Sequence, residues 1–152
     1  MSGLPKISYS DGGVHVTVDL RALDQRMREA QQWLGDRVLE DCKACMPLLT
    51  DSLQQRSHTE DDGKKVVFPG PYARYQYGGK VMVDSVTGKG PRKIPTGPGE
   101  YILRFRKGAK LVATDRPLKY SNPQAVPQWF EHAKRQNKQF WIDGVKEKIG
   151  GK

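Results

Sequence analysis

The sequence predicts an α+β protein in which a long N-terminal amphipathic helix and a C-terminal helix pack on a mainly antiparallel sheet, with a long exposed loop. Two helical stripes of apolar residues, one toward each end, and several short strand-like segments between them predict this class. The strict alternation of strand and helix that is typical of a parallel sheet is not seen. Because 152 residues suffice for one ordinary domain and not for two well-buried ones, we expect residues 1–152 to form a single domain.

The first 50 residues predict a β-hairpin followed by a long helix. Residues 7–18 favour strand on both sides of an aspartate-glycine-glycine turn at 11–13. Asp19 then stands at a helix N-cap position, and an apolar stripe about eight turns long follows it. Pro47 is expected to break this helix near its end. The stripe consists of Leu20, Leu23, Met27, Ala30, Leu34, Val38, Cys42, Cys45 and Leu49.

Short strands and one long loop are predicted in the middle of the chain. Strands are expected near 53–57, at 65–68 and at 73–77, with an acidic turn at 60–63. Residues 78–99 are rich in glycine and proline and poor in core-forming side chains, so the sequence predicts a long, flexible and exposed loop there.

A second hairpin and a helix are predicted in the C-terminal third. The hairpin joins 101–106 to 111–114 through a Lys107-Gly108 turn. The helix is expected to open at Asn122-Pro123 and to reach Ile149, with an aromatic-rich face that packs on the sheet. That face consists of Trp129, Phe130, Ala133, Phe140, Trp141, Val145 and Ile149.

The charge is strongly polarised along the chain. The formal net charge is +9, but residues 1–62 carry a net charge of −4 and residues 63–152 a net charge of +13. This polarity suits head-to-tail contacts between copies, or an acidic partner such as nucleic acid. A solvated basic face without a partner is the simpler alternative.

The two cysteines allow a metal site or simple core packing. Cys42 and Cys45 are spaced as in zinc sites, and twelve residues separate Cys45 from His58. A second histidine three to five residues further on is missing, and both thiols continue the apolar stripe of the helix. We therefore expect free thiols in the core and no metal.

Enzyme chemistry finds little support in the sequence. His15, His58 and His132 are scattered and lie in no nucleophile-base pattern. The glycines of 78–99 lack the spacing of dinucleotide- and phosphate-binding loops. We therefore predict no catalytic residues and no cofactor.

No apolar run approaches the roughly 20 residues of a membrane helix. Met1–Ser10 lacks the basic start and apolar middle of a secretory signal. We expect the protein to be made in the cytoplasm and to have no membrane partner.

Four stretches occur in the order found in a known family. They are Pro47–Leu53, Gly70–Val81 with its tyrosine-alanine pair, Leu118–Pro123, and Trp129–Lys134 followed by a closing tryptophan at 141. In this order the chain resembles the minor capsid proteins of tailed phages that infect Gram-positive bacteria, which are related to the tail-completion and head-tail connector (neck) family. It departs from the family at 51, where aspartate replaces the usual glycine.

The resemblance implies a structural virion protein that is not an enzyme. Such proteins join the DNA-filled head to the tail as a homo-oligomeric ring around the DNA channel; a hexamer is our first expectation and a dodecamer our second. The implied partners are other copies, the portal-adaptor or stopper ring, the tail terminator or tube proteins, and phage DNA bound without sequence preference. The loop at 78–99 is expected to become ordered on assembly.

The residues expected at a partner or subunit interface are aromatic or basic. They are Tyr72, Arg74, Tyr75, Tyr77, Lys80, Lys89, Arg92, Lys93, Arg104 and Arg106. Five of the basic residues in this region would meet DNA phosphates if they faced the channel, namely Arg92, Lys93, Arg104, Arg106 and Lys107. The mixture at 72–77 also fits a stacking platform for single-stranded nucleic acid, although tyrosines in a strand are more often half-buried. The alternative function is a basic nucleic-acid-binding accessory domain that works alone.

Overall fold

The α+β class is confirmed by a computed structural model, which describes residues 6–47, 52–70, 73–120 and 122–150. The elements follow the chain as β1 (Lys6–Asp11), β2 (Val14–Asp19), α1 (Arg21–Lys43), α2 (Ser52–Arg56), β3 (His58–Glu60), β4 (Lys65–Val67), α3 (Ala73–Gly78), β5 (Lys80–Asp84), β6 (Arg92–Gly97), β7 (Glu100–Arg104), β8 (Leu111–Pro117) and α4 (Trp129–Gly150).

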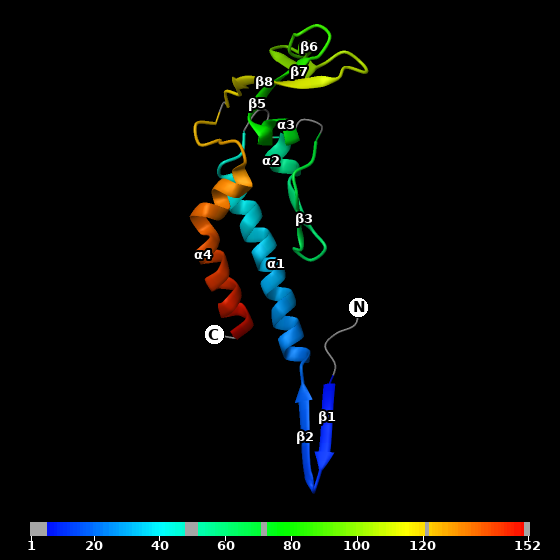
Figure 1. Ribbon diagram of the computed structural model, residues 1–152, viewed down its shortest axis with the longest axis vertical. Coiled ribbons are helices and arrows are strands. Elements are labelled where there is room, and N and C mark those ends of the chain that lie inside the picture. The colour runs from blue at the N-terminus through cyan, green and yellow to red at the C-terminus, as the bar shows by residue number, and fades with distance from the viewer. Residues whose placement is uncertain (1–5, 48–51, 71–72, 121, 151–152) are drawn as a thin grey trace.

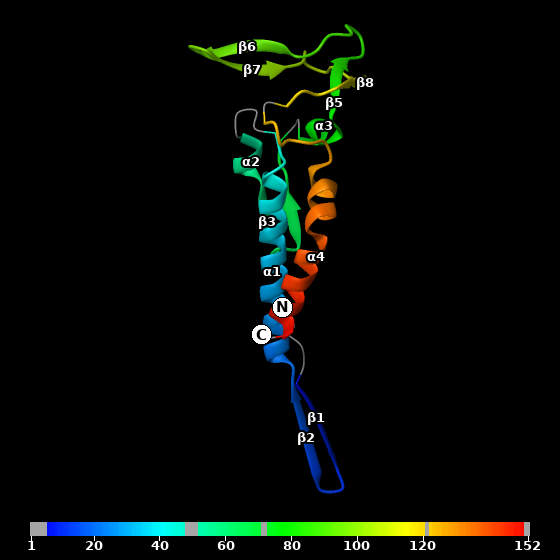
Figure 2. The same cartoon turned by 90° about the vertical axis from the view of Figure 1, so that its left-hand side faces the viewer.

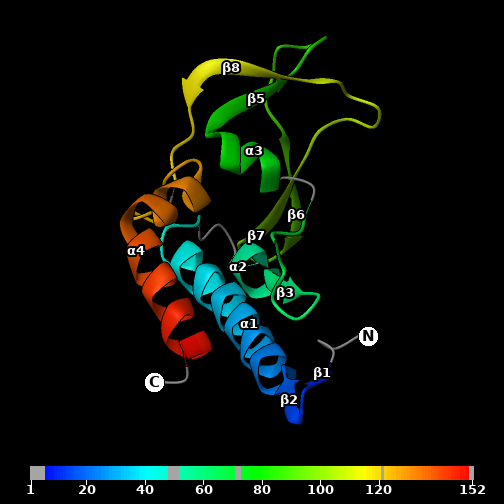
Figure 3. The same cartoon turned by 60° about the horizontal axis from the view of Figure 1, so that its bottom comes forward.

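The molecule is elongated, and helices α1 and α4 form its body. The two helices run antiparallel and pack along each other (Figures 1 and 3). The β1–β2 hairpin projects from the lower end of α1, and the β6–β7 hairpin lies at the opposite end, across the long axis (Figures 1 and 2). Two hairpins are therefore held far apart by one helical pair.

The prediction of a single sheet is wrong. The strands described here form four separate two-stranded antiparallel sheets, β1–β2, β3–β4, β5–β8 and β6–β7. The aromatic face of α4 packs mainly on α1 and not on a sheet, because two amphipathic helices cover each other's apolar stripes. The indole of Trp141 also donates to the Oδ2 of Asp41 on α1 at 2.7 Å.

The N-terminal hairpin is confirmed. Its register runs from Lys6 opposite Asp19 to Asp11 opposite Val14. The two loop residues, Gly12 and Gly13, have φ of 53° and 85°, which is the left-handed pair that a type I′ turn requires.

Helix α1 differs from the prediction at both ends. Its N-cap position is Leu20 and not Asp19, but the Oδ1 of Asp19 still accepts the first helical amide, that of Arg21, at 3.0 Å. The helix ends at Lys43, and the amide of Cys45 then bonds to the carbonyl of Cys42 in a tighter turn before Pro47. The expected continuation to Leu49 reaches residues outside those described.

The core lies where α1 ends and α4 begins. Cys42 and Met46 have no exposed surface, and Trp129 is 1% exposed. The ring of Trp129 meets the rings of Tyr77 and Phe68 edge to face, with centroids 4.8 and 5.7 Å apart. The burial of both cysteines confirms that they continue the apolar stripe.

Two predicted strands are helices. Residues 52–56 form α2, whose leucine, glutamines and arginine are good helix formers. Residues 73–78 form α3, which ends where Gly79 takes a left-handed φ of 72° and its amide bonds to the carbonyl of Tyr75 at 3.1 Å. Strand β4 and the acidic turn at 60–63 are as predicted.

The predictions of a long loop at 78–99 and of a second hairpin at 101–114 are also wrong in detail. Strands β5 and β6 occupy much of 78–99, which leaves Ser85–Pro91 between them. Strand β7 pairs with β6, and β8 pairs with β5, so the 101–114 hairpin does not form. Pairing depends on side-chain contacts between distant segments, which a local pattern does not report.

Helix α4 begins later than predicted, at Trp129 and not at 122. The preceding residues tie the chain to two other elements, since the amide of Val126 bonds to the carbonyl of Cys45 and that of Gln128 to the carbonyl of Tyr77. Gln128 has a φ of 52°, so the backbone turns there before the helix starts.

Candidate assembly interface

The structure spreads the ten predicted interface residues over four elements, α3, β5, β6 and β7, and their connections. Tyr72 lies outside the described residues. Arg74, Tyr75 and Tyr77 lie on α3, and Lys80 opens β5. The other five lie at the upper end of the molecule, in 89–106 (Figure 1). We call residues 80–117 the basic head, because they carry nine lysines and arginines against three acidic residues.

The α3 residues divide into a packing group and a surface group. Tyr77 is half-buried against Trp129, and burial raises the pKa of its hydroxyl. Arg74 is exposed, lies over the ring of Tyr75 at 4.8 Å and donates to its hydroxyl at 2.8 Å. Tyr77 therefore stabilises the fold, while Arg74 and Tyr75 remain available to a partner.

A shallow apolar groove of about 580 Å³ lies beside α3. Trp129, Phe130 and Phe68 line it, and Arg74 and Lys64 are its two cationic side chains. An apolar segment with an acidic residue nearby would complement this groove.

Each face of the β6–β7 hairpin carries both basic and apolar or aromatic side chains. Residues that pair across an antiparallel ladder share a face, so Arg92 and Arg104 lie together with Ile94 and Ile102. On the other face the Lys93 ammonium lies 4.6 Å from the ring centre of Tyr101. Both isoleucines are 38% exposed, so this hairpin offers cations and apolar surface together.

Arg106 has a structural partner. Its Nε donates to the Oδ2 of Asp84 at 2.5 Å and its Nη2 to the Oδ1 at 3.2 Å. Asp84 is 3% exposed and also accepts the amide of Val86 at 2.8 Å. These donors, the Arg106 side chain first, lower the pKa of Asp84. Arg106 thus fixes the end of β5, which the sequence alone did not indicate.

The β1–β2 hairpin is a surface that sequence reasoning did not select. Its register places the apolar residues on one face, together with Asp11 beside the turn, and the other polar residues on the opposite face. The apolar face is between 44% and 65% exposed, which is unusual for five such side chains together. They are Ile7, Tyr9, Val14, Val16 and Val18. The alternating valines of 14–18 could have indicated this surface, because they predict an amphipathic strand whose apolar face must pack against another element or another chain.

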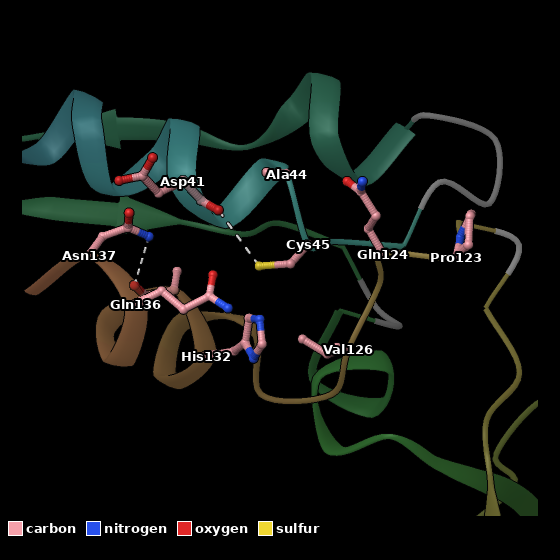
Figure 4. Close-up of a pocket in the computed structure, with 10 residues that line it drawn as sticks. Asp41, Ala44, Cys45, Pro123, Gln124, Val126, His132, Gln136 and Asn137 are labelled. Carbon is pink, nitrogen blue, oxygen red and sulfur yellow. Dashed lines mark hydrogen bonds between the residues drawn. The ribbon is translucent and has the colours of Figure 1, made fainter.

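A polar hollow of about 550 Å³ lies where the ends of α1 and α4 meet (Figure 4). The thiol of Cys45 lies within it and contacts the carbonyls of Cys42 at 3.4 Å and Asp41 at 3.6 Å. Burial raises the pKa of Cys45 and raises that of Cys42 to about 12. Both thiols therefore stay protonated at neutral pH, which does not suit a thiolate nucleophile.

Two kinds of feature are missing from the described residues. No cluster of three or more histidine, cysteine, aspartate or glutamate side chains there is arranged to hold a metal ion. None of the helices in those ranges has the length and apolar character needed to cross a membrane.

Comparison of the chain with protein-family models, with curated proteins and with solved structures gives no match in any of the three.

Proposed function

We propose that the chain is a structural subunit of a phage neck, which joins the DNA-filled capsid and its portal-adaptor complex to the tail as a ring around the DNA channel. The observation that carries this proposal is the placement of two projecting hairpins with exposed apolar side chains at opposite ends of a rigid helical pair (Figures 1 and 2). Such surfaces suit a protein that is covered on several sides by other subunits.

The motif residues behind the family resemblance also meet in space. The hydroxyl of Tyr120 donates to the carbonyl of Gln76 at 2.6 Å, and the Nδ2 of Asn122 donates to the carbonyl of Met46 at 2.9 Å. Together with the contact of Trp129 and Tyr77, these bonds join the ends of α1, α3 and α4. Residues from three of the four motifs, at 70–81, 118–123 and 129–134, thus contribute to this junction, which supports the resemblance.

The proposed ring contains six copies, with twelve as the second choice. Neighbours in a cyclic ring meet through two different faces. The two parts of the chain carry opposite net charge, −4 for residues 1–62 and nine lysines and arginines against three acidic residues in the basic head, which suits contacts between different faces of neighbouring copies. Within the channel, Arg92, Lys93 and Arg104 would contact DNA phosphates without reading sequence.

Deleting the gene from the phage tests this function. The proposal predicts DNA-filled heads and separate tails in lysates, and restoration of joined particles by the wild-type protein. Joined, infectious particles that lack the protein would contradict it.

The alternative, a nucleic-acid-binding domain that acts alone, is favoured by the basic β6–β7 hairpin. A two-stranded ribbon fits the major groove of DNA, and this one carries Arg92, Lys93 and Arg104. It predicts tight, salt-sensitive DNA binding by the isolated monomer, whereas the neck subunit binds DNA weakly outside the assembly.

A further inference from the structure

The β1–β2 hairpin has two open edges. In the described part of the chain, β1 pairs with β2 and with no other strand. The hairpin also projects beyond the ends of α1 and α4 (Figures 1 and 2). Because an isolated two-stranded hairpin is only marginally stable in water, it gains from further strands, and these would come from another chain.

Nothing in this hairpin blocks further pairing. Natural edge strands are protected by proline, by bulges or by charges along the strand. The β1–β2 register runs without a shift and without proline, and its acidic and lysine side chains lie only at the strand ends, as Lys6, Asp11 and Asp19. The β6–β7 ladder, in contrast, contains Pro95 and a register shift.

The turn determines which backbone groups face outward. In a two-residue turn the carbonyl of Asp11 and the amide of Val14 face each other, so these residues form a hydrogen-bonded pair. Hydrogen-bonded and non-bonded pairs alternate along an antiparallel ladder. The backbone groups of Ser8 and Ser10 therefore point away from the hairpin on one edge, and those of His15 and Thr17 on the other.

We propose that β2 of one copy pairs antiparallel with β1 of the next copy, so that the hairpins of the ring form one continuous sheet. This inference rests on the proposed function, because the ring supplies the neighbouring copy. Each added hairpin continues the order β1–β2–β1–β2, in which every neighbouring pair is antiparallel. A closed ring of such hairpins leaves no free edge.

The side chains at the two edges complement each other. Lys6 and Asp19 lie on the same face at matching ends of the hairpin. In the intrachain register repeated across the seam, Asp19 of one copy, which also accepts from the Arg21 guanidinium of its own chain, lies beside Lys6 of the next. Tyr9 and Val16, which also pair within the chain, then meet across the seam on the apolar face and shield each other from water.

Hydrogen exchange distinguishes this seam from any other contact. The free protein is compared with the protein assembled on the portal-adaptor complex of the same phage. We expect exchange at the outward amides of Ser8 and Thr17 to slow by about tenfold or more on assembly, because each gains a hydrogen bond. The inward amides of Tyr9 and Val16 serve as the internal control and change less.

A pair of variants at one position provides the second test. Thr17→Pro removes an outward donor from the edge, whereas Thr17→Val keeps the amide and the branched side chain. We expect Thr17→Pro to lose assembly and Thr17→Val to keep it. Exchange at Tyr9 and Val16 in the free Thr17→Pro protein checks that the hairpin itself persists.

The possible failures are separable. Rings that form with Thr17→Pro, or wild-type rings in which Ser8 and Thr17 exchange as fast as in the free protein, overturn the seam and leave the neck function intact. Wild-type protein that never associates with the portal-adaptor complex counts against the neck function as well.

Discussion

The hairpins at the two ends of the molecule, β1–β2 and β6–β7, are nearly equal in length but differ in their edges and faces. The first has a regular register, a face that is apolar except for Asp11 opposite a polar face, and no proline in its strands. The second contains Pro95, a register shift and faces on which cations and isoleucines are mixed.

The exposed apolar surface of this molecule is therefore of two kinds. On β1–β2 it accompanies open, regular edges, which suit pairing with another copy. On β6–β7 it accompanies arginines on an interrupted ladder, which suits a polyanion or an acidic protein surface.

Weakening the α1–α4 pair that holds the hairpins apart should have the largest effect on the free energy of unfolding. Trp141 is 6% exposed and bonds to Asp41 across the helical pair. We expect Trp141→Ala to lower the free energy of unfolding by about 3–5 kcal/mol, measured by denaturant titration, because it opens a cavity and removes a partner of a carboxylate. Phe140→Ala, at a side chain that is 53% exposed, should cost less than about 1 kcal/mol. Equal losses in the two variants would contradict the packing described.

Truncating the apolar face of β1–β2 should separate assembly from stability. Tyr9 is 65% exposed, so Tyr9→Ser should change the free energy of unfolding by less than about 0.5 kcal/mol. Assembly should weaken by about tenfold or more, because the proposed contact between subunits loses an aromatic side chain. Val86→Ser, at a residue that is 77% exposed in the β5–β6 connection, is the control and should alter neither. Native mass spectrometry across a concentration series measures the effect, and equal weakening by both variants would count against a special role for β1–β2.

Removing cations from β6–β7 should alter the salt dependence of DNA binding. We expect Arg92→Gln and Arg104→Gln each to reduce the slope of log K against log salt concentration by about one, since each loses one phosphate contact. Lys6→Gln, on the opposite hairpin, should leave the slope unchanged. Fluorescence anisotropy with a short duplex measures these slopes, and a larger change in Lys6→Gln would reverse the assignment of the two ends.

The ion pair at the end of β5 should give a smaller, pH-limited effect. Arg106 and the Val86 amide lower the pKa of Asp84 below its ordinary value of 3.8. Their stabilisation is therefore fully present above about pH 4 and is lost as the pH falls through the lower pKa of the folded protein. Wild-type protein should lose its advantage in Tm over Asp84→Asn as the pH falls from about 4 to the acid limit of folding. A constant difference in Tm over this range would contradict the pairing.

Local signals predicted the parts of the fold that depend on neighbouring residues. The glycine pair at 12–13 fixes its own turn, and the stripe from Leu23 to Cys42 spans enough turns to identify its helix. Residues 73–78 are too few to separate a helical period from a strand period, although Gly79 was a usable stop signal.

Long-range pairing could not be predicted in the same way. The pattern at 101–114 correctly predicts two strand segments, but they do not pair with each other. Strand β8 pairs with β5, and β7 pairs with β6, so β6 and β7 form a hairpin inserted between β5 and β8. Most of the basic residues in the candidate interface were found from charge alone. The partner of Arg106 was not, because Asp84 lies 22 residues away in the sequence.

The number of copies that bind the portal-adaptor complex of the proposed phage is the sharpest test of the neck function. Mass measurement of the purified complex, with negative-stain imaging, should give a closed ring of six copies, or of twelve, around a central channel. A single bound copy, or a protein that stays monomeric and instead binds free DNA tightly, would contradict the account.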